Sequence, residues 1–446
     1  MLLFTPPRRL RHVDEEAGEN LGMGYVGAAL AQAGIDVELL DAGLEGWNTA
    51  RSVREIRGRT WKVLGLSVVL PTMVPPALSI LENLGSPGLV MMGGHTPSLA
   101  AERLLAGSPR DDLVVVVGEG EVTSVELVRA YLSGASLDGI PGIARSGPNR
   151  SEPRPLIQDL DALPFPDRRY LRPALARGQD AMVASSRGCY NNCVFCSVGA
   201  FYGLSPGPKW RARSPGNIAD EVERLVKDHS VRQFRFADDN FMGPGEKGRQ
   251  RAEAIAGEFL KRRLPVRFEV SVRANDVEED LFRQLKEAGL YRVFLGVEAG
   301  VDACLERLGK NLTVEENRRA VFTLRRLGLE PYIGFILFDP DTTLNELVQN
   351  LAFLQEIRGK DGIVNSRLDL LNRLEVYEGT PVSGLLRSQG RLTGNYLDYR
   401  YPFKDRGVAL IYSALRLAQR LLIPVRRSLN RARRLLKARS PASLEG

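Results

Sequence analysis

The chain has 446 residues, of which 43% are hydrophobic and 26% are charged, proportions typical of a packed globular protein and unlike those of a disordered or fibrous one. A single hydrophobic core rarely serves more than about 250 residues, so the length predicts two or three domains. No apolar run reaches the roughly 18 residues that a membrane-spanning helix needs, and the N-terminus lacks the apolar segment of a signal peptide. We therefore expect a cytoplasmic protein without a transmembrane segment.

The formal net charge of +7 has much of its excess of Lys and Arg near the C-terminus, between residues 426 and 439. Without this segment the charge balance is near neutral, and basic residues on a helix most often form a solvated face. The charge therefore does not predict a nucleic-acid partner, and we expect none.

Over residues 1–145, short β-rich runs alternate with helical stretches, which predicts a doubly wound, Rossmann-like parallel sheet. The expected strands are Leu2–Thr5, Asp36–Leu40, Val63–Val68, Leu89–Met92 and Leu113–Val117. Their nearly continuous apolar character is typical of strands buried on both faces. Residues 146–180 hold several prolines and charges with little periodicity, which indicates an ordered linker between domains.

From residue 181 to residue 385, a second alternation of strands and helices runs at longer spacing and predicts a partial β/α barrel, so the chain as a whole belongs to the α/β class. The expected strands are Ala181–Ser185, Gln233–Ala237, Val266–Val272, Arg292–Val297, Tyr332–Leu337 and Asp369–Val376. Ser214 followed by Pro215 predicts the start of a helix that continues through Ile218–Lys227. Residues 386–446 are expected to form a small helical, basic region.

Three of the four cysteines, Cys189, Cys193 and Cys196, fall within eight positions directly after the expected strand Ala181–Ser185. So few cysteines do not make a disulfide framework, and their clustering favours a metal site. Three thiolates leave one iron of a 4Fe–4S cluster open to an external ligand. The alternatives are a structural zinc site, which needs a fourth ligand that is missing locally, and a chance group of buried cysteines. Cys304 has the helical spacing of a core residue.

The spacing CxxxCxxC, with the aromatic Phe195 before the last cysteine, resembles the motif of the radical S-adenosylmethionine (SAM) superfamily. The resemblance implies that the three cysteines are the catalytic metal ligands of a 4Fe–4S cluster. It also implies that SAM binds the open iron and is cleaved reductively to a 5′-deoxyadenosyl radical. The electron is expected from an external donor of the flavodoxin or ferredoxin type, with which a basic face could associate.

Later segments resemble the SAM-binding motifs of that superfamily in the same order. The matching residues are Asp238, Asp239 and Asn240 where the SAM amino group is contacted, Arg273 and Glu298 where ribose and carboxylate are held, and Gly334 with Phe335 where adenine packs. All follow expected strand ends, the face on which β/α barrels build active sites. The alternatives are structural, because an Asp-Asp-Asn loop also makes helix caps and turns, and a strand-end Glu also pairs with a nearby Arg.

The first domain resembles the cobalamin-binding domain that precedes many radical SAM cores. Its strand-end residues Gly93, Gly94, Gly118 and Glu119 are expected at the cofactor, since glycines let a flat, bulky group approach the backbone. The DxHxxG motif, with which some cobalamin proteins supply an axial histidine, is missing, and His95 is no substitute for it. Because members of the resembling subgroup can bind cobalamin without a histidine ligand, the missing motif does not exclude the cofactor. The resemblance thus implies cobalamin as a third cofactor, and a vestigial domain that only shapes the active site is the alternative.

Taken together, these resemblances imply an enzyme that functionalises an unactivated carbon of a polar small molecule. With cobalamin, the reaction is C-methylation, as in class B methyltransferases, and we favour it. Without cobalamin, the reaction is a dehydration, deoxygenation or mutase rearrangement of a sugar or aminocyclitol in natural-product biosynthesis, as in the aminoglycoside radical dehydratases. Tyr377, Glu378, Tyr396 and Tyr399 are candidate substrate contacts, although aromatic residues near a barrel end also serve packing.

Overall fold

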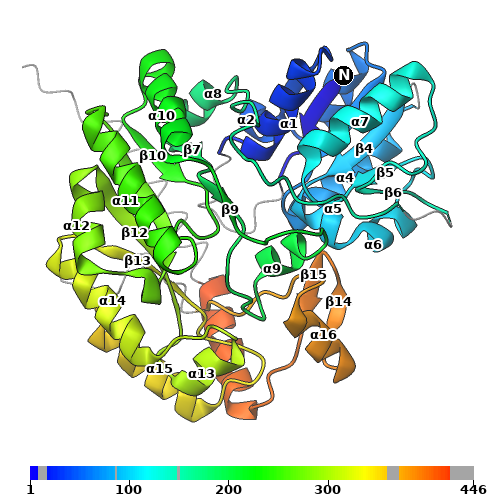
Figure 1. The fold of residues 1–446 in the computed structure, drawn as a ribbon. Coiled ribbons are helices and arrows are strands. Elements are labelled where there is room, and N and C mark those ends of the chain that lie inside the picture. Colours follow the sequence, from blue (N-terminus) through cyan, green and yellow to red (C-terminus); the bar gives the residue numbers. More distant parts are fainter. Residues whose placement is uncertain (9–17, 86–87, 148–150, 359–370, 422–446) are drawn as a thin grey trace, which may run out of the picture.

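The computed structural model describes residues 1–8, 18–85, 88–147, 151–358 and 371–421. Figure 1 shows two β-sheets with their helices, one in the N-terminal part of the chain (blue to cyan) and one in the part that follows (green to yellow). The break between them falls between the last strand of the first sheet and the first strand of the second, that is, between residues 144 and 181. The domain boundaries within this interval stay predictions.

The N-terminal sheet has the order β2-β1-β3-β4-β5-β6, with β1 to β5 parallel and β6 antiparallel to β5. Its strands are β1 (Leu2–Thr5), β2 (Glu38–Asp41), β3 (Val63–Ser67), β4 (Leu89–Gly93), β5 (Val114–Val116) and β6 (Ile143–Ala144). The predicted doubly wound sheet is confirmed. The edge strand β6 was missed, because a two-residue strand has no readable alternation.

Helices cover both faces of this sheet. They are α1 (Leu21–Gln32), α2 (Ala42–Glu45), α3 (Thr49–Arg57), the 3₁₀ turn η1 (Pro71–Met73), α4 (Val74–Glu82), α5 (His95–Leu99), α6 (Ala101–Ala106) and α7 (Gly120–Ser133). Within β1, Leu2 and Phe4 pack in the core that includes α3 and α4, whereas Leu3 packs in the core that includes α1 and α7. Burial on both faces explains why these strands are apolar throughout.

The second sheet is parallel, with the order β13-β12-β11-β10-β7, and it forms an open, partial barrel. Its strands are β7 (Ala181–Val183), β10 (Gln233–Phe236), β11 (Arg267–Arg273), β12 (Leu290–Glu298) and β13 (Pro331–Phe335), with the short pair β8 (Ser186–Arg187) and β9 (Arg211–Ala212) beside it. The helices are α8 (Leu171–Ala176), α9 (Ser197–Tyr202), α10 (Pro215–His229), α11 (Gly245–Lys261), α12 (Glu279–Glu287), α13 (Asp302–Arg307), α14 (Val314–Arg326) and α15 (Leu344–Glu356), with a 3₁₀ turn, η2 (Ala274–Asp276). The predicted start of α10 is confirmed, since Ser214 accepts a hydrogen bond from the N–H of Asn217 and Pro215 opens the helix.

A sixth barrel strand over Asp369–Val376 was a wrong prediction for residues 371–376, and residues 369 and 370 lie outside the described part of the chain. The segment meets the sheet end at one bridge, between Phe338 and Arg373. Its apolar residues Leu374 and Val376 pack in a separate cluster with Leu386 instead of joining the barrel core. The apolar residues of this segment are therefore buried, as a strand would bury them, but they pack against the helix that contains Leu386 and not in the barrel.

The C-terminal part contains α16 (Pro381–Ser388), a hairpin of β14 (Thr393–Asn395) and β15 (Asp398–Arg400), and a helix over residues 406–421. The region from residue 386 onward is thus partly a hairpin, where only helix was expected. Residues 422–446, with the basic cluster, lie outside the described part of the chain. Among the described helices, none is both long enough and apolar enough to span a membrane.

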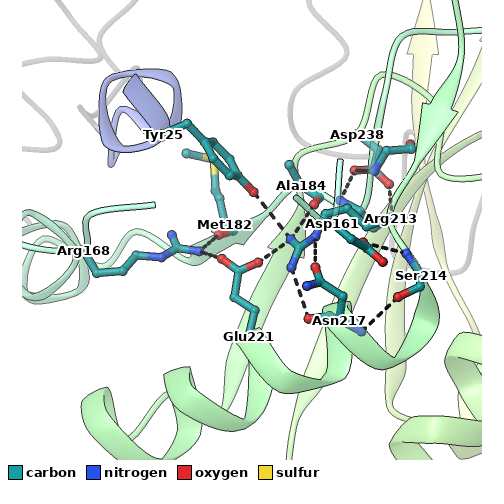
Figure 2. A network of polar contacts seen from close by, with 12 residues as sticks. Tyr25, Asp161, Arg168, Met182, Ala184, Arg213, Ser214, Asn217, Glu221 and Asp238 are labelled. Carbon is teal, nitrogen blue, oxygen red and sulfur yellow. Dashed lines mark hydrogen bonds and ion pairs between the residues drawn. The ribbon is translucent and has the colours of Figure 1, made fainter. Parts of the chain in front are cut away.

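A buried ion network joins the first domain, the linker and the barrel (Figure 2). Arg168 of the linker lies 2.6 Å from Glu19 and 2.5 Å from Glu221 of α10. Arg213 pairs with the same Glu221 and donates to the hydroxyl oxygen of Tyr25 on α1, at 3.4 Å. The charged ends of these ion-paired groups are shielded from water. Removal of one charged side chain would therefore leave its partners buried without an opposite charge.

We expect Glu221→Ala to lower the free energy of unfolding by about 3 kcal/mol, because Arg168 and Arg213 would stay buried with incomplete partners. Denaturant titration followed by circular dichroism measures the change. The control is Arg283→Ala, which removes a surface pairing with Asp280 (2.7 Å) and should change the stability by less than about 1 kcal/mol. Equal effects of the two substitutions would contradict the role given to the network.

Candidate active site

The three clustered cysteines lie on a loop that follows β7 and the short strand β8. Gly188 stands directly before Cys189 and has a φ of +82°. A Cβ atom at Gly188 would lie 1.8 Å from the carbonyl oxygen of Lys209, so the close pairing of β8 with β9 admits only glycine there. The loop ends where Cys196 precedes α9.

The thiols of all three cysteines are free and half-buried. Burial raises the pKa of Cys196 to about 11 and also raises the pKa of Cys189. Two donors face Cys193 Sγ: Asn191 Nδ2 at 3.0 Å and Arg273 Nη1 at 3.9 Å. Such donors stabilise a thiolate, the form that binds iron, so the residues present fit an iron–sulfur cluster.

A site for one isolated ion is a different arrangement. Across the described ranges, no group of three or more His, Cys, Asp or Glu side chains is arranged to hold a single metal ion. In a 4Fe–4S cube each cysteine binds its own iron, so three ligands are spread around the cluster and do not converge on one point. The absence of a single-ion site among the described residues therefore does not count against a cluster.

The Asp-Asp-Asn segment follows β10, and two of its side chains are buried against protein. Asp238 accepts hydrogen bonds from the backbone N–H groups of Ser185 (2.7 Å) and Ser186 (3.0 Å), and so it fixes the chain that leads to the cysteines. The side-chain amide of Asn240 lies 3.4 Å from the carboxylate of Asp276. Both residues have partners within the protein.

Asp239 is the member of this segment that faces open space. Its carboxylate accepts a hydrogen bond from the N–H of Gly188 at 3.2 Å and lines two neighbouring cavities. The side chain is accessible from those cavities although protein surrounds it on its other sides, and this burial raises its pKa to about 6.

Arg273 and Glu298 meet at Lys310, a residue that the sequence motifs did not single out. Arg273 Nη2 donates to the backbone carbonyl of Lys310 at 2.5 Å, and Lys310 Nζ lies 3.0 Å from Glu298 Oε1. Glu298 has a φ of +66° at an irregularity in the pairing of β12 with β13. A non-glycine residue in this conformation is strained, and such strain is frequent at functional sites. No sequence pattern marks a lone lysine as buried, which is why it was missed.

Gly334 pairs with Gly296 on the neighbouring strand, beside the Glu298–Lys310 contact. A Cβ atom at Gly296 would lie 2.7 Å from Lys310 Nζ, and one at Gly334 would lie 2.8 Å from the ring of Phe294. The space beside both glycines is therefore filled by protein side chains, and the packing of Lys310 and Phe294 requires glycine at these two positions.

Two aromatic residues that were expected at cofactors have apolar protein neighbours. Phe335 belongs to the barrel core. Phe195 packs beside Leu308, Leu374 and Val376, so it connects the cysteine loop to the segment that follows the barrel. A direct contact of either ring with a cofactor stays a prediction.

A cavity of about 390 Å³ lies between the N-terminal sheet and the cysteine loop. Its wall includes the predicted residues Gly93, Gly94, Gly118 and Glu119 from the first domain and Arg187, Tyr202 and Asp239 from the second. Gly94 has a φ of +116°, and a Cβ atom there would lie 2.4 Å from the carbonyl oxygen of Val68. The backbone itself thus requires glycine at this position, whether or not a ligand approaches it.

Glu119 lies in the wall of this cavity but has strong partners in the protein. Its carboxylate accepts hydrogen bonds from Arg187 Nη1 (3.0 Å), Arg211 Nη1 (2.9 Å) and the N–H of Ile157 (2.7 Å). Arg187 Nη2 also lies 2.5 Å from Glu121. Glu119 therefore connects the first domain to the strands that frame the cysteine loop.

A second cavity, of about 220 Å³, adjoins the cysteine loop and contains three of the candidate substrate contacts in its wall: Tyr377, Glu378 and Tyr396. His95 lines both cavities, and its ring stacks on Phe201 with a centroid distance of 4.7 Å. Burial lowers the pKa of His95 to about 4, so the imidazole is neutral at physiological pH. We call this space the aromatic cavity.

The carboxylate of Glu378 is already paired. Arg103 of α6 lies 3.3 Å from it, Arg387 of α16 lies 3.1 Å from it, and the hydroxyl of Tyr399 donates to it. Tyr399 itself lies outside the aromatic cavity. Glu378 thus connects the C-terminal part to the first domain.

Comparisons with known proteins agree with this arrangement. The family model of the radical SAM superfamily matches residues 183–354, and the model of the B12 binding domain matches residues 10–128. An uncharacterised methyltransferase of Pyrococcus horikoshii is 29% identical over 367 residues, covering 80% of this chain and 78% of the relative. The hopanoid C-3 methylase of Methylococcus capsulatus is 30% identical over 334 residues, covering 72% of this chain and 61% of the relative.

Among solved structures, OxsB, a cobalamin-dependent SAM radical enzyme with aqua-cobalamin and SAM bound, superposes with a TM-score of 0.81. The match covers 95% of this chain and 67% of that one at 21% identity, so it concerns the fold. The chain therefore contains a radical SAM domain, the domain of enzymes that use a 4Fe–4S cluster and SAM, and this domain follows a B12-binding domain.

Proposed function

We propose that this enzyme binds its cluster through Cys189, Cys193 and Cys196, binds cobalamin in the 390 Å³ cavity, and methylates an unactivated carbon of a polar small molecule. The observation that carries the proposal is the wall shared by the two cavities. Asp239 and His95 line both of them, so a corrin in the first and a substrate in the aromatic cavity would lie on opposite sides of the same side chains. When bound, the cluster and SAM supply a carbon radical and cobalamin supplies the methyl group.

The protein's part begins at the thiolates. Asn191 and Arg273 place an amide and a guanidinium group against Cys193 Sγ, at 3.0 and 3.9 Å, and both lower the cost of holding negative charge there. We assign Arg273 to the support of the cluster, since its other guanidinium nitrogens are taken up by Lys310 and Asn275. This replaces the ribose contact expected from the motif.

We assign the recognition of SAM to Glu298 and Lys310, with the adenine contact near Gly334 resting on the resemblance to the superfamily motif alone. A paired carboxylate and ammonium can bind the amino and carboxylate groups of one amino-acid moiety. The neutral His95 and the aromatic side chains around it would exclude water from the reacting carbon. The electron would come from an external donor of the flavodoxin or ferredoxin type, an assignment that rests on the radical SAM domain alone.

The triple substitution of Cys189, Cys193 and Cys196 by Ala is expected to abolish iron binding and all formation of 5′-deoxyadenosine while the fold survives, because the cysteines lie on a loop and outside the main cores. Iron and sulfide analysis and product chromatography measure both effects. Cys304→Ala, at the buried cysteine, is the matched control and should keep iron and activity. Cluster content near the wild-type value in the triple variant would disprove the central assignment.

Glu298→Gln is expected to weaken SAM binding about tenfold with iron content unchanged, because it removes a charge beside the ligand and leaves the thiolates alone. Arg273→Ala should instead lower the iron content, because its guanidinium faces Cys193. Equilibrium binding of SAM and iron analysis separate the two effects.

The control for Glu298→Gln is Glu306→Gln, the same chemical change at an exposed position. It should leave the SAM affinity and the iron content at their wild-type values. If Glu298→Gln lost iron as well, Glu298 would be a structural residue and the assignment would fail.

Ser124→Leu is expected to lower the amount of bound cobalamin at least fivefold, because Ser124 lines the 390 Å³ cavity from α7 and a leucine would fill part of it. Corrin absorbance after desalting measures occupancy, and iron content should not change. Ser133→Leu, an exposed position on the same helix, is the control. Wild-type protein that keeps no corrin and still turns over fully would refute methylation and favour the dehydratase, deoxygenase or mutase reaction.

A further inference from the structure

A third cavity, of about 500 Å³, lies next to the aromatic cavity, and the two have Leu70, Pro71, Tyr377 and Tyr396 in common. We call it the outer cavity. The shared residues make the two spaces direct neighbours. The outer cavity is the larger and more polar of the two.

The charged residues of the outer cavity are mainly arginines. Its wall contains Arg373, Arg400, Arg416 and Arg420 together with the acidic residues Glu375 and Asp398. Arg400 is compensated, since its guanidinium lies 2.6 Å from Asp398 on the same hairpin. Glu375 accepts a hydrogen bond from the hydroxyl of Tyr377 at 2.7 Å.

Arg416 and Arg420 stand one turn apart on the helix over residues 406–421, so their side chains extend from the same face. Within the described ranges, neither has a carboxylate within 4.0 Å. The wall has four arginines against the two carboxylates of Glu375 and Asp398, and this excess of cations makes the potential of the cavity positive.

Arg373 adds a third cation, and the protein holds it in place. Its guanidinium lies over the rings of Tyr401, Phe403 and Tyr412, at 3.7, 5.0 and 5.6 Å from their centroids, and it donates to the carbonyl of Tyr401. Its Nε is buried and has no hydrogen-bond partner in the described part of the chain. Aromatic packing fixes the side chain without neutralising its charge.

We propose that the outer cavity binds a phosphoryl group of the substrate, so that the substrate is a phosphate or diphosphate ester whose reacting carbon lies in the aromatic cavity. The inference rests on the proposed function, because it takes the aromatic cavity as the place of reaction. Guanidinium groups bind phosphoryl oxygens through paired hydrogen bonds, and Arg416, Arg420 and Arg373 offer several such donors in one concave space. A concave space of about 500 Å³ has the size of a site for a small molecule.

The test is isothermal titration calorimetry of the reconstituted full-length enzyme with inorganic pyrophosphate as the probe, at low ionic strength and at matched pH. We expect saturable binding by the wild type. The double variant Arg416→Gln/Arg420→Gln should weaken it at least tenfold, and Arg416→Lys/Arg420→Lys should retain part of it because the charge is kept. Acetate, a singly charged carboxylate, should bind at least tenfold more weakly than pyrophosphate.

The matched control is Lys404→Gln/Arg406→Gln, which removes the same charge at exposed positions outside the outer cavity, at the start of the same helix. It should leave pyrophosphate affinity within about twofold of the wild type. Binding that survives in the cavity variant would place the anion elsewhere, for example on the basic C-terminal segment, and would overturn the proposal. So would a cavity variant that binds pyrophosphate normally but is reduced more slowly by flavodoxin, which would assign these arginines to the electron donor.

The two proposals fail in different ways. Absence of pyrophosphate binding in a wild-type enzyme that contains iron and forms 5′-deoxyadenosine would overturn the phosphoryl site alone. Absence of iron and of SAM cleavage would overturn the proposed function, whatever the calorimetry shows.

Discussion

The relative position of the two sheets depends on buried guanidinium groups that join the first domain to the frame of the cysteine loop. Arg187 stands two residues before Cys189 and pairs with both Glu119 and Glu121 at the start of α7, at 3.0 and 2.5 Å. Arg211, on the partner strand β9, pairs with the same Glu119 at 2.9 Å. Buried ion pairs gain little net stability, because desolvation offsets their attraction, but a displaced partner leaves a buried charge uncompensated. The cost of displacement fixes the loop against the B12-binding domain.

The ion pairs between the domains explain why Glu119, which was expected at the cofactor, has a structural role. Glu119 follows a glycine-bearing strand end, where a polar residue would ordinarily face a ligand, yet two arginines take up its carboxylate. A similar logic holds for Gly94 and Gly188, where a Cβ atom would collide with backbone at 2.4 and 1.8 Å. The space between the domains is therefore bounded by groups that cannot shift independently. Under the proposed function, such a wall would hold the two cofactors at a fixed separation.

The sequence allowed the fold to be predicted where periodicity and spacing are local properties. The parallel strands of the first sheet, the start of α10 at Ser214 and the loop with three cysteines were all readable, because apolar runs, caps and short-range spacing do not depend on the rest of the fold. The prediction of a strand over Asp369–Val376 failed because it depended on tertiary packing, which is not a local property. The segment's alternation of apolar residues fits a strand and also fits the small cluster around Leu386, and only the tertiary fold decides between them.

At the site, too, the sequence motifs locate the segments, but only the tertiary structure shows which side chain faces a cavity. A motif can indicate that Arg273 and Glu298 lie at strand ends, but which of them reaches a ligand depends on Lys310, which approaches from a loop with no signature of its own. Likewise, Asp238, Asp239 and Asn240 are adjacent in sequence, and only Asp239 faces the cavities. Adjacent residues at a strand end point in different directions, so a motif assigns the segment and the structure must assign the side chain.

The three cavities form a series in which polar recognition and chemistry are separated. The glycine-walled cavity of the B12-binding domain meets the aromatic cavity at Asp239 and His95, and the aromatic cavity meets the outer cavity at Tyr377 and Tyr396. Among the described residues, the arginines of the outer cavity outnumber its carboxylates, whereas the aromatic cavity has mainly apolar and aromatic walls. Contacts to a remote charged group can fix the position of a distant carbon without polar groups beside it. Under the proposed function, an unactivated carbon offers nothing to hydrogen-bond, so its position has to be set by interactions elsewhere on the molecule, and the arginines of the outer cavity would provide them.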